Sequence, residues 1–147
     1  LVNLPGETAA VVTCLDGSQR AELAVPAAAE LAGRLGAEVV LVRVVPDAAA
    51  GPGSGGVPEL AYLNDVAERI GGVPVAIDLV HDREPARAIA EYASDHDDTI
   101  VVMATHGRGG LQEFVLGSVA REVVHQADCP VMVVPPRTGD RSGLRRR

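Results

Sequence analysis

Strongly aliphatic runs recur along the chain, and stretches with helical spacing of apolar residues separate them. Five runs are expected to form β-strands, over residues 9–15, Glu38–Val45, 73–80, 99–103 and Val131–Val134. Their β-branched residues are nearly continuous rather than alternating with polar ones. This pattern is typical of strands that are covered on both faces of a parallel sheet.

The segments between these runs have the pattern of amphipathic helices. Helices are expected over residues 18–35, 59–70, 84–93 and 118–126. Ser18 is suited to cap the first helix, and Gly36 is suited to end it. Pro26 must either kink that helix or confine its regular part to the later turns. Strands and helices that alternate with short connectors predict a doubly wound α/β fold with right-handed crossovers.

One segment breaks the alternation. Residues 46–58 contain four Gly and three Pro, so we expect a loop over one end of the sheet. Two interpretations stay open: a neutral insertion, or a lid near a ligand at the carboxyl ends of the strands. No internal boundary is evident, and the prediction is one domain over residues 1–136 with a flexible Arg-rich tail over 137–147.

The composition favours a soluble protein with an aliphatic core. Apolar residues make up 47% of the chain, but it has no Trp, one Phe and two Tyr, and no apolar run long enough to span a membrane. Cys14 and Cys129 lie beside or within aliphatic runs, where reduced thiols and a cytoplasmic location are expected. Residues 1–8 lack the segments of a secretory signal. Because Leu1 is not Met, we expect the natural chain to begin further upstream.

Charge is unevenly distributed. Five of the 13 basic residues lie in 137–147, which leaves 8 basic and 19 acidic residues in 1–136, a net charge of −11. Such a body repels polyanions, so we expect no nucleic-acid partner. Every basic side chain is Arg, which excludes a P-loop lysine, a Schiff-base lysine and a lysine general base.

The stretch 103–119 carries the clearest chemical signal. Its glycines cluster directly after an expected strand, and Gly117 and Ser118 open an expected helix. Glycines allow close backbone approach and positive φ, and a helix start offers unpaired N–H groups to an anion. A phosphate site and a merely tight connection are both consistent with this pattern.

The same stretch resembles the universal stress protein family. ATP-binding members carry a glycine, two residues, a glycine, nine residues, then glycine and Ser or Thr; here these positions are Ala104, Gly107, Gly117 and Ser118. The segments ATHGRGG, LGSVAREVV and CPVMVV are similar to the family's C-terminal half, and CLDGS to its first strand end. The departure is Ala104, which replaces the first glycine.

This resemblance implies an adenine-nucleotide site. Asp16 would bond to the sugar or the adenine edge, and the backbone of Val44 would contact adenine. Met103 and Ala104 would line the sugar. The phosphates would be surrounded by Gly107, Arg108, Gly117, Ser118 and Val119. Arg108 is added as a cation in a phosphate loop, and a solvated loop residue is the alternative.

In a sheet ordered 3-2-1-4-5, the predicted five-stranded parallel arrangement, strands one and four are neighbours whose crossovers leave toward opposite faces. Ligands settle at such a switch point, beyond the carboxyl ends of the strands. Asp16 and Ala104 are expected there together. His106 lies in the same loop, but no partner residue supports a catalytic role, and we expect packing or loop bonding instead.

The expected ligand is therefore ATP, or AMP or cyclic AMP, with Mg²⁺ arriving alongside the phosphates, and no catalytic residue or structural metal is expected. The resemblance also implies a homodimer through the edge strand Val131–Val134. A regulatory stress protein with little or no fast hydrolysis fits these features. The alternatives are a nucleotide-free dimeric interaction protein and a slow adenine-nucleotide hydrolase.

Overall fold

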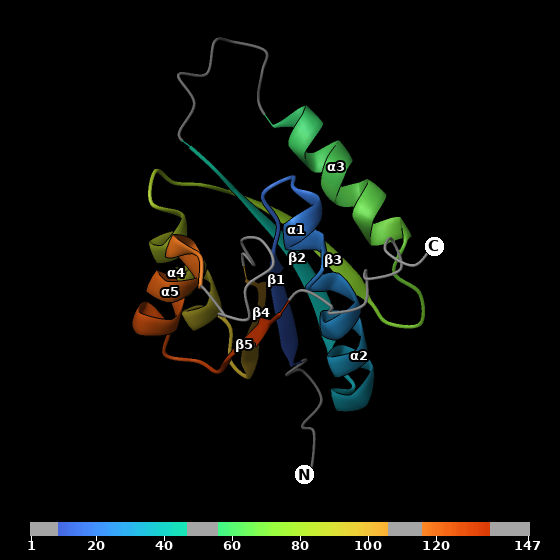
Figure 1. The fold of residues 1–147 in the computed structure, drawn as a ribbon. Helices are drawn as coiled ribbons and strands as arrows, with labels where there is room; N and C mark the ends of the chain where they lie inside the picture. The colour runs from blue at the N-terminus through green and yellow to red at the C-terminus, as the bar shows by residue number, and fades with distance from the viewer. Residues whose placement is uncertain (1–8, 47–55, 106–115, 136–147) are drawn as a thin grey trace, which may run out of the picture.

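A five-stranded parallel sheet runs through the molecule and carries helices on both faces (Figure 1). The computed structural model describes residues 9–46, 56–105 and 116–135. The strands are β1 (Ala10–Cys14), β2 (Glu38–Val45), β3 (Val75–His81), β4 (Thr99–Ala104) and β5 (Val131–Val134). Their order is β3-β2-β1-β4-β5, which confirms the predicted sheet.

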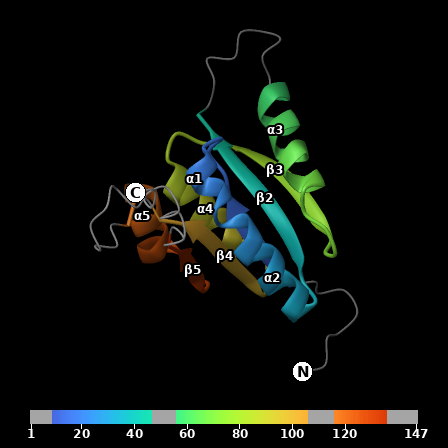
Figure 2. The same ribbon diagram turned by 45° about the vertical axis from the view of Figure 1, so that its right-hand side comes forward.

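The helices divide between the two faces (Figures 1 and 2). They are α1 (Gln19–Glu22), α2 (Val25–Leu35), α3 (Val57–Glu68), α4 (Pro85–Ser94) and α5 (Ser118–Gln126). Helices α4 and α5 bury Ile89 and Val123 against one face, where Val12 of β1 lies. Helices α2 and α3 bury Ala28 and Leu63 against the other face. This covering explains why the strand sequences are apolar on both sides.

Strand register fixes where the strands end. In β1, Cys14 pairs with Val42 of β2, and Thr13 pairs with Val102 of β4. From β1 the chain crosses through α1 and α2 to β2, and from β4 it crosses through α5 on the opposite face to β5. The order therefore reverses between β1 and β4, which makes this pair the topological switch point.

The first predicted helix is split. The structure has α1 and α2 in place of one helix over 18–35, with Pro26 in the first turn of α2, where a missing N–H costs nothing. The interpretation in which Pro26 confines the regular helix to later turns is thus correct. Gly36 ends α2 with φ of 65°, a left-handed conformation that favours glycine.

The loop predicted over 46–58 extends two residues too far at its C-terminal end. Val57 and Pro58 already belong to α3, because proline is well tolerated in a first helical turn. Residues 47–55 of that loop, like the predicted tail 137–147, lie outside the described residues. The bounds of β2, β5 and α5 match the prediction at both ends, and the remaining boundaries differ from it by at most two residues.

Candidate functional site

A cavity of about 180 Å³ opens at the carboxyl ends of β1 and β4. Its wall is formed by the ends of these strands together with α1, α4 and α5, so it occupies the switch point of the sheet. The lining residues are Cys14, Leu15, Asp16, Arg20, Ala21, Val44, Pro85, Ile89, Met103, Ala104, Thr105, Gly117, Ser118, Val119 and Ala120.

Seven of the nine site residues expected from the sequence line this one cavity. They are Asp16, Val44, Met103, Ala104, Gly117, Ser118 and Val119. The other two, Gly107 and Arg108, lie outside the described residues. Parallel strands end at a common edge, and this brings Asp16 and Ser118 to the same space although they are distant in sequence.

Asp16 lies in a turn that local hydrogen bonds fix. Its Oδ1 accepts from the backbone N–H of Ser18 at 2.8 Å, and the Oγ of Ser18 accepts from the N–H of Ala21 at 3.2 Å, which caps α1. Gly17 between them has φ of +89°, where a side chain would be strained and would crowd the guanidinium of Arg43. Asp16 is exposed and lines the cavity, and the backbone N–H of Ser18 fixes the position of its carboxylate there.

Val44 presents backbone groups beyond the end of β1. The carbonyl of Val42 accepts from the N–H of Leu15 at 2.8 Å, so the backbone of Val42 points toward β1. In a parallel strand, every second residue directs its N–H and carbonyl to the same neighbouring strand. The N–H and carbonyl of Val44 therefore point to the β1 side, as those of Val42 do. The pairing of β1 with β2 ends at Cys14 and Val42, so Val44 faces the cavity rather than another β1 residue.

Helix α5 begins at the cavity with an uncapped first turn. Gly117 occupies the N-cap position, and among the described residues no side chain accepts a hydrogen bond there. The first backbone N–H groups and the exposed hydroxyl of Ser118 are therefore directed to the same region, with the partial positive charge of the helix start. Gly117 has φ of −58°, so the expectation of a positive φ is wrong at this glycine, and any residue fits its backbone.

Ala104 has an ordinary strand conformation. It is the last residue of β4 and pairs with Val134, and Asp98 is the only non-glycine residue of the described ranges with positive φ. The alanine that replaces the first glycine of the motif consequently introduces no backbone strain. Its methyl group adds to the cavity wall beside Met103.

The wall near β1 and β4 is apolar. Met103 and Ile89 lie there with Cys14, whose pKa burial raises to about 12. The thiol therefore stays protonated near neutral pH and behaves as a small apolar group. Thr105 is buried, and its N–H donates to the carbonyl of Val134 at 3.0 Å, which ties the end of β4 to β5.

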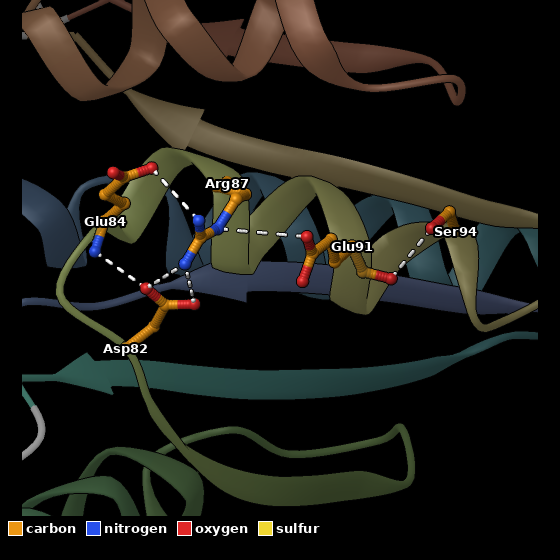
Figure 3. Close-up of polar contacts among 5 residues, drawn as sticks. All are labelled: Asp82, Glu84, Arg87, Glu91 and Ser94. Atoms are coloured by element: carbon orange, nitrogen blue, oxygen red, sulfur yellow. Dashed lines mark hydrogen bonds and ion pairs between the residues drawn. The ribbon is translucent and has the colours of Figure 1, made fainter.

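A carboxylate and an arginine form hydrogen bonds at the start of α4 (Figure 3). Asp82 accepts from the backbone N–H of Glu84 at 2.8 Å and from Arg87 at 2.9 and 3.1 Å. The Glu84 hydrogen bond, and after it the Arg87 contact, hold the pKa of Asp82 below its ordinary value. This network places Pro85 and Ile89 at the cavity wall.

Sequence reasoning missed eight of the lining residues: Cys14, Leu15, Arg20, Ala21, Pro85, Ile89, Thr105 and Ala120. The apolar ones carry no chemical signal of their own. Arg20 had one signal: it stands two residues after the N-cap Ser18 of the helix that follows Asp16. Within the described ranges, no cluster of three or more His, Cys, Asp or Glu residues is arranged to hold a metal ion. No helix in those ranges is both long and apolar enough to cross a membrane.

Known proteins with similar sequences and folds agree on one family. The model of the universal stress protein family matches residues 8–135. A universal stress protein of Mycobacterium tuberculosis is 37% identical over 136 residues, which covers 85% of this chain and 45% of the relative. The chain thus spans less than half the length of that relative.

Two solved structures share the fold. A universal stress protein family member from Burkholderia pseudomallei is 30% identical, with a TM-score of 0.64 over 90% of this chain and 100% of the other. The universal stress protein of Archaeoglobus fulgidus in complex with dAMP is 24% identical, with a TM-score of 0.68 over 86% and 96%. Because the family model matches residues 8–135, which include all of the described residues, this chain belongs to the universal stress protein family.

Proposed function

We propose that this protein binds an adenine nucleotide, ATP in the first place, in the cavity at the ends of β1 and β4. The observation that carries the proposal is the meeting of Asp16, Val44 and Ser118 on one cavity at the switch point. A carboxylate, a strand backbone that faces the cavity and an uncapped helix start complement a sugar, a base edge and a phosphate.

Each group has a role in this proposal. The N–H and carbonyl of Val44 bond to the adenine edge, and Asp16 accepts from the sugar hydroxyls or the base. Met103 and Ala104 pack against the sugar. Gly117, Ser118 and Val119 surround the phosphates at the start of α5. Gly107 and Arg108 lie outside the described residues: Gly107 is assigned to the phosphates on the family motif, and Arg108 as a cation in the same loop.

The solved relative from Archaeoglobus fulgidus holds dAMP, which supports an adenine nucleotide as the ligand class for this fold. AMP and cyclic AMP are accordingly included beside ATP. Asp16 is the one acidic residue among the described residues that line the cavity. Mg²⁺ is held mostly by phosphate and water in such sites, so a bound Mg²⁺ would take at most this one carboxylate from the described wall.

The proposed role is regulatory, with little or no fast hydrolysis. Among the described lining residues there is no His to act as a general base, and the chain has no Lys to neutralise the γ-phosphate. Two rival functions are a nucleotide-free interaction protein and a slow hydrolase of adenine nucleotides. The methyl group of Ala104 is the feature that favours the first rival, because it narrows the cavity.

Calorimetric titration with ATP tests the proposal directly. The double variant G117V/S118A crowds the helix start and removes the hydroxyl, so its dissociation constant for ATP should rise at least about tenfold. The matched control G71V/S94A makes the same two changes outside the cavity, and a Cβ at Gly71 meets open space. Equal affinities of the two variants would reject the site.

Release of bound nucleotide on denaturation is a second measurement. Protein purified without added ligand should release ATP, AMP or cyclic AMP on acid denaturation. If none is released and wild-type protein shows no heat of binding with MgATP, the nucleotide-free rival is correct. Turnover of ATP that disappears in D16A or S118A would instead establish the slow hydrolase.

The proposal extends to assembly and location. We infer a cytoplasmic homodimer that pairs through β5, which is an edge strand of the sheet and exposes 45% of Met132. Unpaired backbone groups and an exposed apolar side chain on an edge strand favour addition of a second chain. Cys14 and Cys129 are free thiols, as a reducing cytoplasm would keep them.

A further inference from the structure

Arg20 contributes the only positive side chain among the described residues that line the cavity. Asp16 is the only negatively charged side chain among the same residues. The whole chain contains no Lys, so a permanently charged cationic side chain in this site has to be an arginine.

The position of Arg20 is determined by the turn before it. The two hydrogen bonds at Asp16 and Ser18 set the direction of α1, and Arg20 is the second residue of this helix. Helix α1 contacts β4, so it lies over the switch point rather than over β1 alone. Arg20 therefore reaches the cavity from the α2 face, whereas Ser118 reaches it from the α5 face.

The Arg20 guanidinium is not engaged by other parts of the described structure. It makes no hydrogen bond or ion pair with any described residue and is exposed. Three other arginines are already paired: Arg34 with Glu30, Arg69 with Glu22, and Arg87 with Asp82. In a chain with a net charge of −7, an arginine that stays unpaired at the wall of a cavity is available to an anionic ligand.

We propose that Arg20 binds a phosphate of the nucleotide opposite the start of α5, so that the site selects phosphorylated adenosine over adenosine. This inference rests on the proposed function and adds a residue to it. The planar guanidinium bonds to two phosphate oxygens at once, while the N–H groups of the helix start bond to others. Asp16 and Val44 bind the adenosine part of the nucleotide in this proposal.

The experiment compares adenosine, AMP and ATP by calorimetric titration against wild-type protein, R20Q and R20K. Removal of a charged hydrogen bond to phosphate should weaken AMP and ATP about tenfold in R20Q, with adenosine affinity unchanged. R20K keeps the charge but not the bidentate geometry and should give an intermediate loss. The control is R34Q, which makes the same change at the far end of α2 and should leave all three ligands unaffected.

Salt gives a second readout. The AMP affinity of wild-type protein should fall more steeply between low and moderate NaCl than that of R20Q, because one charge contact is missing in the variant. If AMP binds wild-type protein and R20Q equally well, or if R20Q weakens adenosine as much as AMP, the inference is overturned while the proposed function stands. If wild-type protein binds none of the three ligands, both are overturned.

Discussion

At the scale of single residues, one buried hydroxyl stands out. Thr13 lies at the middle of the sheet, fully buried between Leu41 of β2 and Val102 of β4. Its Oγ1 has no hydrogen-bond partner among the described residues. A buried hydroxyl without a partner costs free energy because it loses its hydrogen bonds with water on folding.

Replacement of this residue should stabilise the protein. Thr13→Val keeps the branched shape and removes the unsatisfied hydroxyl, so the free energy of unfolding should rise by about 1 kcal/mol in urea denaturation. The matched control is Thr99→Val, since Thr99 is also buried but its Oγ1 donates to the carbonyl of His96 at 3.0 Å. That control should lose about 1 kcal/mol. A loss in both variants would show that Thr13 has a partner in solution.

Residues also show where sequence reasoning reaches its limit. Asp16 and Ser118 were predictable as neighbours because both follow from strand order and from the rule that parallel strands end at one edge. Arg20 was not, because its approach to the cavity depends on the direction of α1, which the hydrogen bonds at Asp16 and Ser18 set and the apolar spacing does not reveal. A continuous helix over 18–35, as the spacing predicts, gives no reason to single out this arginine.

At the scale of elements, the start of α4 depends on one side chain from outside the helix, that of Asp82. Asp82 accepts from the N–H of Glu84 in the turn before α4, and the side chain of Glu84, the N-cap residue, makes no cap hydrogen bond (Figure 3). Because Pro85 and Ile89 line the cavity, the stability of this turn also fixes one wall of the site.

Asp82→Asn should lower the thermal midpoint at pH 7. The lowered pKa of Asp82 means that its contribution is present above the ordinary value of 3.8 and is lost as the pH falls through the lower folded-state pKa. The difference between variant and wild type should therefore shrink as the pH falls below about 4. Glu84→Gln is the control, since its exposed side chain lies 3.5 Å from Arg87 and its backbone N–H is unchanged. A pH-independent difference would contradict this account.

Elements differ in how well the sequence predicts them. The bounds of β2 were predicted at both ends, because the run EVVLVRVV is uninterrupted and Gly36 stops the helix before it. The start of α3 was not, because a Gly- and Pro-rich composition indicates a loop while Pro58 is equally suited to a first helical turn. The composition of 46–58 indicates a loop for the segment as a whole, whereas the start of α3 depends on the single residue Pro58.

At the scale of the whole molecule, the two edges of the sheet are unequal. β3 has seven residues and lies beside α3, whereas β5 has only four residues and ends the sheet on the other side. Met132 of β5 is exposed, while Val131 and Val134 of the same strand pack against opposite faces of the sheet. An edge strand with unpaired backbone groups and an exposed apolar side chain is suited to pair with a second copy of the same chain.

Charge on this edge should therefore separate the proposed dimer. Met132→Glu places a carboxylate where two β5 strands would meet. Like charges related by a two-fold axis lie close to each other, so the variant should sediment as a monomer.

Leu35→Glu is the matched control: Leu35 is 47% exposed, close to the 45% of Met132, but it ends α2 away from β5. The control should keep the mass of the wild-type protein in light scattering. Circular dichroism should be unchanged in both variants, because neither side chain is buried. Wild-type protein that is already monomeric would overturn the dimer, and Met132→Glu protein that stays dimeric would place the interface elsewhere. Nucleotide binding at the carboxyl ends of β1 and β4 is tested independently.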